Sequence, residues 1–152
     1  MLGVVCPLGW PPFCEVMAVN KILLVMYRRL MRDAMSFALA RNPDFDLFWE
    51  QDYHNAVCAA RTYRPHIVVL EIPEGDSESP ADYLEICADI KAALPCCRLM
   101  LMCPENSVAC RQAAVAAMQS GAIADFIYYD VSMDYLLSKL EVLSAEASAP
   151  DL

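Results

Sequence analysis

The sequence predicts an α/β fold, in which a parallel β-sheet is wound on both sides by helices. Short apolar runs alternate with segments whose apolar residues recur at helical spacing, five times between Lys21 and Ala147. Runs such as "IVVL" (67–70) and "LMLM" (99–102) are apolar at every position, which is typical of strands buried on both faces. Strands joined by helices pair in parallel through right-handed crossovers. We therefore expect a doubly wound three-layer sandwich.

The first part of the chain is expected to hold strands over 21–25, 45–50 and 66–72, and helices over 28–42 and 53–63. Asn42–Pro43 and Pro65 end the two helices, because proline cannot continue a helical ladder. The first helix is predicted to turn one apolar face inward, formed by Leu30, Met31, Ala34, Met35, Ala38 and Leu39.

The second part is expected to hold strands over 98–102 and 125–129, and helices over 81–94, 106–120 and 133–147. Ser79 and Pro80 suit the N-cap and first residue of one helix. Gly121 suits the C-cap of another, and Ser132 suits the N-cap of the last.

The ends of the chain differ from this pattern. Residues 1–18 contain three prolines and two glycines and no lysine or arginine, and they lack the basic start of a secretory signal. We expect a flexible N-terminal extension over 1–18, a single domain over 19–146 and a disordered tail over 147–152.

Composition excludes several classes of function. The net charge is −9 and the basic residues form no long stripe, so we expect no contact with nucleic acid. No apolar run approaches the roughly 20 residues that span a bilayer, so we expect no membrane segment. Eight cysteines form no CxxC pair and only two histidines are present, so we expect no metal and reduced thiols in a cytoplasmic protein, with Cys96 and Cys97 as the candidate exposed thiols. An acidic domain of this kind is expected to bind other proteins.

Two stretches, "RPHIVVLEI" (64–72) and "GAIADFIYYD" with "MDYLLSKL" (121–130 and 133–140), resemble the receiver domain of bacterial response regulators (CheY-like). The first is similar to the family's third strand, and the second is similar to its fifth strand and last helix. The resemblance covers residues 21–145. It implies a flavodoxin-like five-stranded sheet in the order 2-1-3-4-5 with five helices, and a role in two-component or phosphorelay signal transduction. The site of such folds lies at the carboxyl ends of the strands.

The resemblance also implies where a phosphoacceptor pocket would lie. The family's two acidic magnesium ligands match Met26 and Tyr27, and a thioether and a phenol cannot replace carboxylate oxygens. The phosphoacceptor aspartate matches Glu71, one methylene longer. The family's hydroxyl matches Cys103, and its lysine matches Tyr129, or Tyr128 if the register shifts by one.

We therefore expect a degenerate pseudo-receiver that is not phosphorylated. Glu71 is interpreted either as a fixed anion that stands in for a phosphorylated aspartate and reaches Cys103 or Tyr129, or as a solvated strand-end carboxylate. The arginines of "RRLMR" (28–32) are expected either to pair with Glu71 or Glu74 or to solvate the first helical turn.

The same resemblance implies a contact surface on the fourth helix, fifth strand and fifth helix. Phe126 matches the family's aromatic switch, although a plain core role suits it better. The predicted surface residues are Met118, Phe126, Tyr128 and Tyr135. The expected partners are a kinase, an output protein or a second copy of the chain.

Two alternatives stay open. Glu71 could be an active but atypical phosphoacceptor, or the domain could bind a small ligand on a flavodoxin-like fold. The chain has neither GxGxxG nor GxxxxGK[ST], and no GxSxG elbow, so we expect no nucleotide cofactor and no enzymatic activity.

Overall fold

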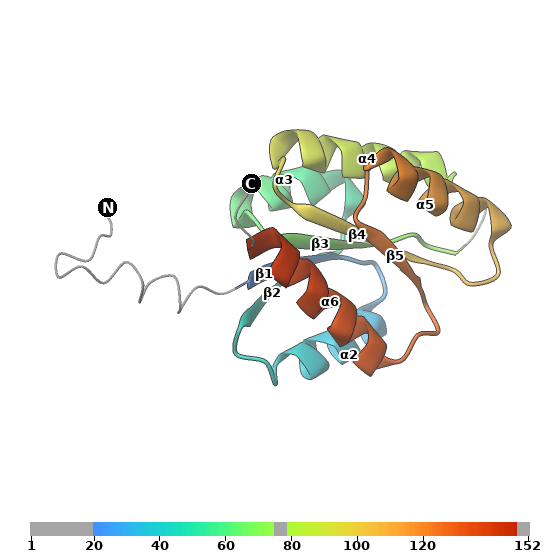
Figure 1. Ribbon diagram of the computed structural model, residues 1–152. Coiled ribbons are helices and arrows are strands. Elements are labelled where there is room, and N and C mark those ends of the chain that lie inside the picture. Colours follow the sequence, from blue (N-terminus) through green and yellow to red (C-terminus); the bar gives the residue numbers. More distant parts are fainter. Residues whose placement is uncertain (1–19, 75–78, 149–152) are drawn as a thin grey trace.

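The computed structural model describes residues 20–74 and 79–148. Its middle layer is a five-stranded parallel sheet in the order β2-β1-β3-β4-β5 (Figure 1). The strands are β1 (Asn20–Val25), β2 (Phe45–Glu50), β3 (Ile67–Glu71), β4 (Arg98–Cys103) and β5 (Asp125–Tyr128). The strand order confirms the flavodoxin-like topology that the sequence predicts.

Five α-helices cover the sheet, two on one face and three on the other (Figure 1). Helices α2 and α6 lie on one face, and α3, α4 and α5 lie on the other. The helices are α2 (Arg29–Leu39), α3 (Ala56–Tyr63), α4 (Pro80–Ala93), α5 (Val108–Ser120) and α6 (Met133–Ser148), and a 3-10 turn, η1 (Tyr53–Asn55), precedes α3. The predicted three-layer sandwich is therefore confirmed.

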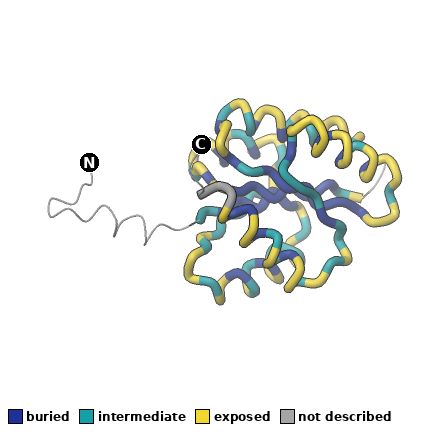
Figure 2. Tube along the Cα trace, viewed as in Figure 1, coloured by how far each residue is buried: buried dark blue, intermediate teal, exposed yellow. Residues whose placement is uncertain are grey.

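The core is split into two layers by the sheet, because successive strand residues point to opposite faces. Along β1, Leu23 and Val25 pack towards α3, α4 and α5, whereas Ile22 and Leu24 pack towards α2 and α6. Figure 2 shows the buried residues concentrated along the strands and the exposed residues on the outer sides of the helices. Burial on both faces explains why the strands are apolar without alternation.

Capping residues fix the helix ends where the sequence places them. Ser79 and Asp82 form a capping box at the start of α4, with Pro80 as its first residue. Ser107 caps α5, and its hydroxyl accepts a hydrogen bond from the backbone N–H of Cys110. Gly121 ends α5 in the left-handed conformation with φ of 83°, which confirms the predicted C-cap.

The predicted inward face of α2 is wrong at two positions. Met35 and Leu39 are buried, but Leu30 and Ala34 are exposed. Helix α2 carries apolar residues on two sides, and only the side with Met35 and Leu39 meets the sheet. Apolar spacing alone does not say which of two such sides is buried.

The predicted flexible extension over 1–18 and the last four residues of the predicted tail lie outside the described residues. Helix α6 continues to Ser148, two residues into the segment expected to be the tail. The cysteines in the described part are free thiols, and Cys96 is exposed as expected, whereas the neighbouring Cys97 is buried and Cys58 is exposed. None of the helices within 20–74 and 79–148 combines the length and apolar character needed to cross a bilayer.

Candidate functional site

The candidate site lies where the carboxyl ends of the parallel strands meet. Backbone hydrogen bonds hold the segments after the strands in register at this edge. The N–H of Met26 donates to the carbonyl of Glu50, that of Ile72 to Met102, and that of Tyr129 to Cys103. These bonds join β1 to β2, β3 to β4 and β4 to β5, and the pairing of Val25 with Leu70 joins β1 to β3. The ends of the five strands therefore lie side by side, and side chains that follow them can converge.

Glu71 is the acid at this edge, and its side chain has no exposed surface. Arg28, in the segment between β1 and α2, forms an ion pair with Glu71 through Nε and Oε2. The Arg28 guanidinium also lies over the ring of Tyr129, with 4.1 Å between Cζ and the ring centroid. One cation thus contacts both the acid at the end of β3 and the aromatic residue that follows β5.

A second phenol fixes the backbone of the same strand end. The hydroxyl of Tyr53, in η1, donates a hydrogen bond of 2.5 Å to the carbonyl oxygen of Glu71. Tyr53 also packs edge-on against Tyr83 of α4, with 5.5 Å between the ring centroids. The carboxyl end of β3 is therefore held from the side of α3 and α4 as well as by Arg28.

Burial sets the protonation of the groups around Glu71. It raises the pKa of the Glu71 carboxyl, and the hydrogen bond and charge of Arg28 oppose that rise. Burial, together with the nearby charge of Glu71, raises the pKa of both Tyr53 and Tyr129, so both phenols stay protonated at neutral pH. The site consists of one acid, one guanidinium and two neutral phenols.

The residues matched to the family's magnesium ligands do not face a common pocket. Met26 is completely buried in the core layer beneath α2 and α6, and its carbonyl accepts a hydrogen bond of 2.9 Å from the indole N–H of Trp49. Tyr27 is 39% exposed. Cys103 is buried on the other side of the sheet, where burial raises the pKa of its thiol to about 12.

The donor set does not fit a magnesium ion. Mg²⁺ requires oxygen ligands in octahedral geometry, and the only carboxylate matched to the pocket, Glu71, is already paired with a cation. Over the described residues, no three His, Cys, Asp or Glu side chains are grouped closely enough to hold a metal ion. The neutralising charge next to Glu71 comes from Arg28 instead.

Glu71 forms its side-chain ion pair with Arg28, one of the arginines expected to pair with it, and not with Cys103 or Tyr129, the partners expected of a fixed anion. The hydroxyl of Tyr129 is buried and makes no hydrogen bond within the described part of the chain, although its ring contacts Arg28. Phe126 and Tyr128 share one face of β5, with 5.7 Å between their ring centroids, and both pack against the core beneath α5. Tyr128 and Tyr129 thus point to opposite sides of the sheet.

Sequence analysis does not identify two residues of the site, Tyr53 and Trp49. Tyr53 is 18 positions from Glu71 and belongs to the segment predicted as a helix, so its role as a donor to β3 has no local signal. Trp49 bonds to Met26 and supports the guanidinium of Arg32, with 3.8 Å between Cζ and its ring centroid. The aromatic character of β2 was visible in the sequence, but its contacts depend on strand order.

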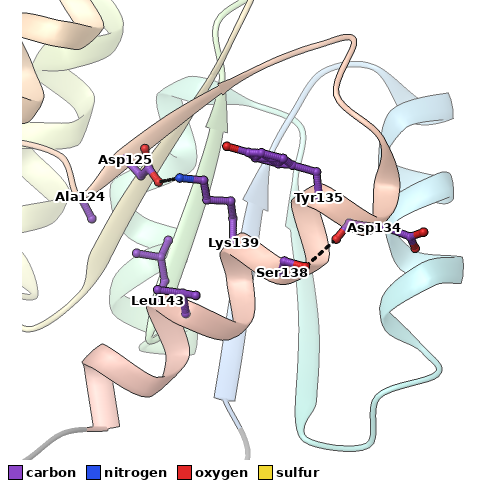
Figure 3. A pocket seen from close by; sticks show the side chains of 8 residues that line it. Ala124, Asp125, Asp134, Tyr135, Ser138, Lys139 and Leu143 are labelled. Atoms are coloured by element: carbon purple, nitrogen blue, oxygen red, sulfur yellow. Dashed lines mark hydrogen bonds and ion pairs between the residues drawn. The ribbon is translucent and has the colours of Figure 1, made fainter.

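The predicted contact surface contains a hollow. About 510 Å³ in volume, it lies between the start of β5 and the outer side of α6 (Figure 3). Tyr135, 44% exposed, forms one wall, and Lys139 reaches across to Asp125 with an Nζ–Oδ2 distance of 2.5 Å. Met118, on α5, is 39% exposed.

Several solved structures that share this fold are named as receiver domains or response regulators. The signal receiver domain of a putative Luxo repressor protein from Vibrio parahaemolyticus has a TM-score of 0.68 and 19% identity, over 85% of this chain and 92% of that one. A response regulator from Thermotoga maritima has a TM-score of 0.69 and 16% identity, over 84% of this chain and 98% of that one. A response regulator receiver domain protein (CheY-like) from Methanospirillum hungatei JF-1 has a TM-score of 0.70 and 15% identity, over 86% of this chain and 97% of that one. No family model matches the sequence, and no curated protein matches it.

Proposed function

We propose that the chain is a receiver-like domain of bacterial two-component or phosphorelay signalling that is not phosphorylated and acts in the cytoplasm through protein–protein contacts. It has the receiver fold, with solved neighbours named as response regulators and their receiver domains. The observation that carries the proposal is the ion pair between Arg28 and the fully buried Glu71.

The ion pair argues against phosphotransfer on chemical grounds. A phosphoacceptor oxygen must be reachable by a phosphodonor in line with the leaving group, and a metal ion must neutralise the developing charge. Glu71 has no exposed surface, and one of its two carboxylate oxygens, Oε2, is paired with Arg28, while Oε1 is buried without a hydrogen-bond partner among the described residues. A cation from the chain therefore takes the place that a metal ion and a phosphoryl group would share.

The proposed contact surface is the face built by α5, β5 and α6. It combines exposed Met118 and Tyr135 with the hollow beside Lys139. Tyrosine is favoured at protein interfaces, because its rigid ring adds contact area and its hydroxyl adds a polar tip. A kinase, an output protein or a second copy is the proposed partner, and we propose no catalytic residue, cofactor or nucleic acid.

Intact-mass measurement after incubation with acetyl phosphate and Mg²⁺ tests the absence of phosphotransfer. We expect no added phosphoryl group on the wild type and none on Glu71→Gln, which is the matched control for the acid. A phosphoryl group gained by the wild type and lost in Glu71→Gln would show an atypical phosphoacceptor and overturn the proposal.

A further inference from the structure

Strand β2 forms one edge of the sheet, and no strand within the described residues pairs with its outer side (Figure 1). It pairs with β1 over six consecutive residues without a bulge, and it contains no proline or glycine. None of its residues is fully buried, whereas each of the other four strands has at least one buried residue. The edge is therefore regular and partly exposed, which is the kind of edge that can pair with a further strand.

The hydrogen bonds to β1 show which backbone groups of β2 point outwards. The carbonyl of Glu50 accepts a hydrogen bond of 3.1 Å from the N–H of Met26, so the even-numbered residues of β2 face β1. Successive residues of a parallel ladder alternate in direction, so the N–H and C=O groups of Leu47 and Trp49 point away from the sheet. Nothing in the described part of the chain bonds to these four groups. Two donors and two acceptors in a row are a template for an added strand.

The side chains on the two faces of β2 differ in chemistry. Leu47 and Trp49 pack against the core layer beneath α2 and α6, whereas Phe48 packs against the layer beneath α3, α4 and α5. Because successive strand residues point to opposite faces, Asp46 and Glu50 lie on the same face as Phe48. One face of the edge is therefore apolar, and the other carries two acids.

The acids of this edge are not neutralised by neighbouring cations. Residues 44–52 hold four acids and neither lysine nor arginine. Lys21 of β1 lies opposite Asp46, but its ammonium donates a hydrogen bond of 3.4 Å to the carbonyl of Tyr63. The ion pairs within the described residues involve neither Asp46 nor Glu50. The negative charge of the edge is therefore available to cations of another molecule.

We propose that the outer side of β2 binds an extended segment of another protein, in which basic and apolar residues alternate. The backbone of this segment bonds to the outward groups of Leu47 and Trp49 as an added strand. Its basic residues lie beside Asp46 and Glu50, and its apolar residues lie beside Leu47 and Trp49. Opposite charges on neighbouring strands stabilise their pairing, so the charge pattern selects both the partner and its register.

A second copy of the chain fits this edge less well. Two copies of β2 related by a two-fold axis run antiparallel, and pairing about Phe48 sets Asp46 of each copy against Glu50 of the other. Other registers also oppose acids, because the four acids of 44–52 all stand at even-numbered positions on one face. Like charges directly opposite each other are destabilising. The acids therefore disfavour self-pairing and leave the edge open to a basic strand.

The N-terminal extension also lacks the required chemistry. Residues 1–18 contain no lysine or arginine, so they offer no side-chain cation to Asp46 and Glu50. The edge at β2 lies on the opposite side of the sheet from β5, and so it is separate from the proposed α5–β5–α6 contact surface. The inference does not depend on whether Glu71 accepts a phosphoryl group.

Fluorescence anisotropy with labelled peptides of about eight residues, the length of one strand, tests the proposal. The parent peptide alternates lysine and valine, and we expect it to bind saturably. Two further peptides carry N-methyl groups on the valines only or on the lysines only. Alternate N–H groups of a strand point to opposite edges, so one methylated peptide should bind at least about tenfold more weakly and the other should bind like the parent. A peptide with glutamate in place of lysine should not bind.

Variants of the protein locate the contact. Leu47→Pro removes one outward N–H and leaves the bonds to β1, because proline is tolerated at a sheet edge, and it should weaken binding by about tenfold. Leu47→Val is its matched control and should bind like the wild type. Asp46→Asn and Glu50→Gln should weaken binding and reduce its dependence on salt, whereas Asp89→Asn, at an exposed acid of α4, should change neither. Circular dichroism checks that each variant is folded.

Backbone amide hydrogen exchange gives a readout that needs no variant. The N–H groups of Leu47 and Trp49 should exchange rapidly in the free protein and become protected when the parent peptide is added. The N–H of Phe48, which faces β1, should be protected in both states. No saturable binding, equal effects of the two sets of N-methyl groups, or binding without protection of Leu47 and Trp49 would overturn the proposal.

Two further results would assign the edge to another occupant and replace the proposed partner. A concentration-dependent dimer in light scattering that is lost in Leu47→Pro would assign it to a second copy. Binding of the parent peptide that is seen only after deletion of residues 2–18 would assign it to the N-terminal extension. The intact-mass test of Glu71 is unaffected by either result, so failure of this inference and failure of the proposed function are distinguishable.

Discussion

Arg28 and Glu71 illustrate at the residue scale how a charge is kept inside a protein. A buried carboxylate without a partner is costly, and removing one member of a buried pair leaves the other uncompensated. Arg28 is about 30% exposed, so the cost is smaller than for a fully buried pair. The acid therefore depends on the arginine more than the arginine depends on the acid.

We predict that Arg28→Met lowers the free energy of unfolding by about 2–3 kcal/mol, because Glu71 loses its cation. The double variant Arg28→Met with Glu71→Met should recover most of that loss, since apolar side chains can replace a buried pair at little cost. Urea unfolding of the single and double variants measures both values. A double variant that loses more than Arg28→Met alone would contradict this account.

His66 gives the stability a dependence on pH. Its Nδ1 accepts a hydrogen bond of 3.0 Å from the backbone N–H of Lys21, and a protonated ring could not accept it. Burial, with the charge of Lys21, lowers the pKa of His66 below its ordinary value. The folded state then binds fewer protons than the unfolded state, so the stabilisation is present above about pH 6.5 and is lost as the pH falls through the folded pKa.

The expected result is a free energy of unfolding that decreases from about pH 7.5 to about pH 5.5, and that decreases less in His66→Asn. His54→Asn replaces an exposed histidine and serves as the control. Urea midpoints across this range check the prediction, and identical slopes in wild type and His66→Asn would contradict it.

At the scale of elements, Gly121 shows how a single backbone conformation ends a helix. Its φ is 83°, and a Cβ built there would meet nothing within 4 Å. Space is therefore available for a side chain, and only the left-handed backbone disfavours one. The end of α5 depends on this residue because β5 begins four positions later.

We predict that Gly121→Ala lowers the free energy of unfolding by about 1–2 kcal/mol, the cost of a left-handed alanine. Gly121→Asn should cost less, because asparagine adopts this conformation more readily. Equilibrium unfolding in urea distinguishes the two variants, and an alanine variant as stable as wild type would show that the end of α5 can rearrange.

The sequence predicts these elements well because their signals are local. Gly121 and Ser79 act within a few residues of where they stand, and the apolar strands need no knowledge of their neighbours. The buried side of α2 was predicted less well, since Leu30 and Met35 both belong to plausible apolar faces. Only the sheet decides between those faces.

The candidate site is harder to predict, because its contacts also depend on how the strands are arranged in the sheet. That Glu71 ends a buried strand was visible in the sequence, as was a nearby group of arginines. Which arginine reaches the acid, and that Tyr129 lies beneath it, depends on β1 lying beside β3 and on β5 lying beyond β4. These contacts join residues 43 positions or more apart, so no sequence motif encodes them.

At the scale of the whole molecule, two core layers lie on the two sides of a sheet that begins at Asn20. Within the described part of the chain, their buried residues run from Ile22 to Leu143. The strand β1 is central, since it pairs with both β2 and β3. The fold should therefore tolerate loss of the residues that precede β1 but not loss of β1 itself.

We predict that deletion of residues 2–18 changes the free energy of unfolding by less than about 0.5 kcal/mol, as for changes outside a core. A deletion of residues 2–24, which removes most of β1, is the control and should prevent cooperative folding. Thermal and urea unfolding provide the comparison. A large loss of stability in the shorter deletion would show that the extension packs on the domain.

The cation that faces Glu71 belongs to the same chain, so it is present as soon as the domain folds. An acyl phosphate hydrolyses, so a regulator that carries one returns to its unphosphorylated state at the rate of that hydrolysis. An arginine side chain is never hydrolysed away. Under the function proposed above, the domain is in the same state from the moment it folds, and a cell would adjust its output through the rates at which the protein is made, degraded or sequestered.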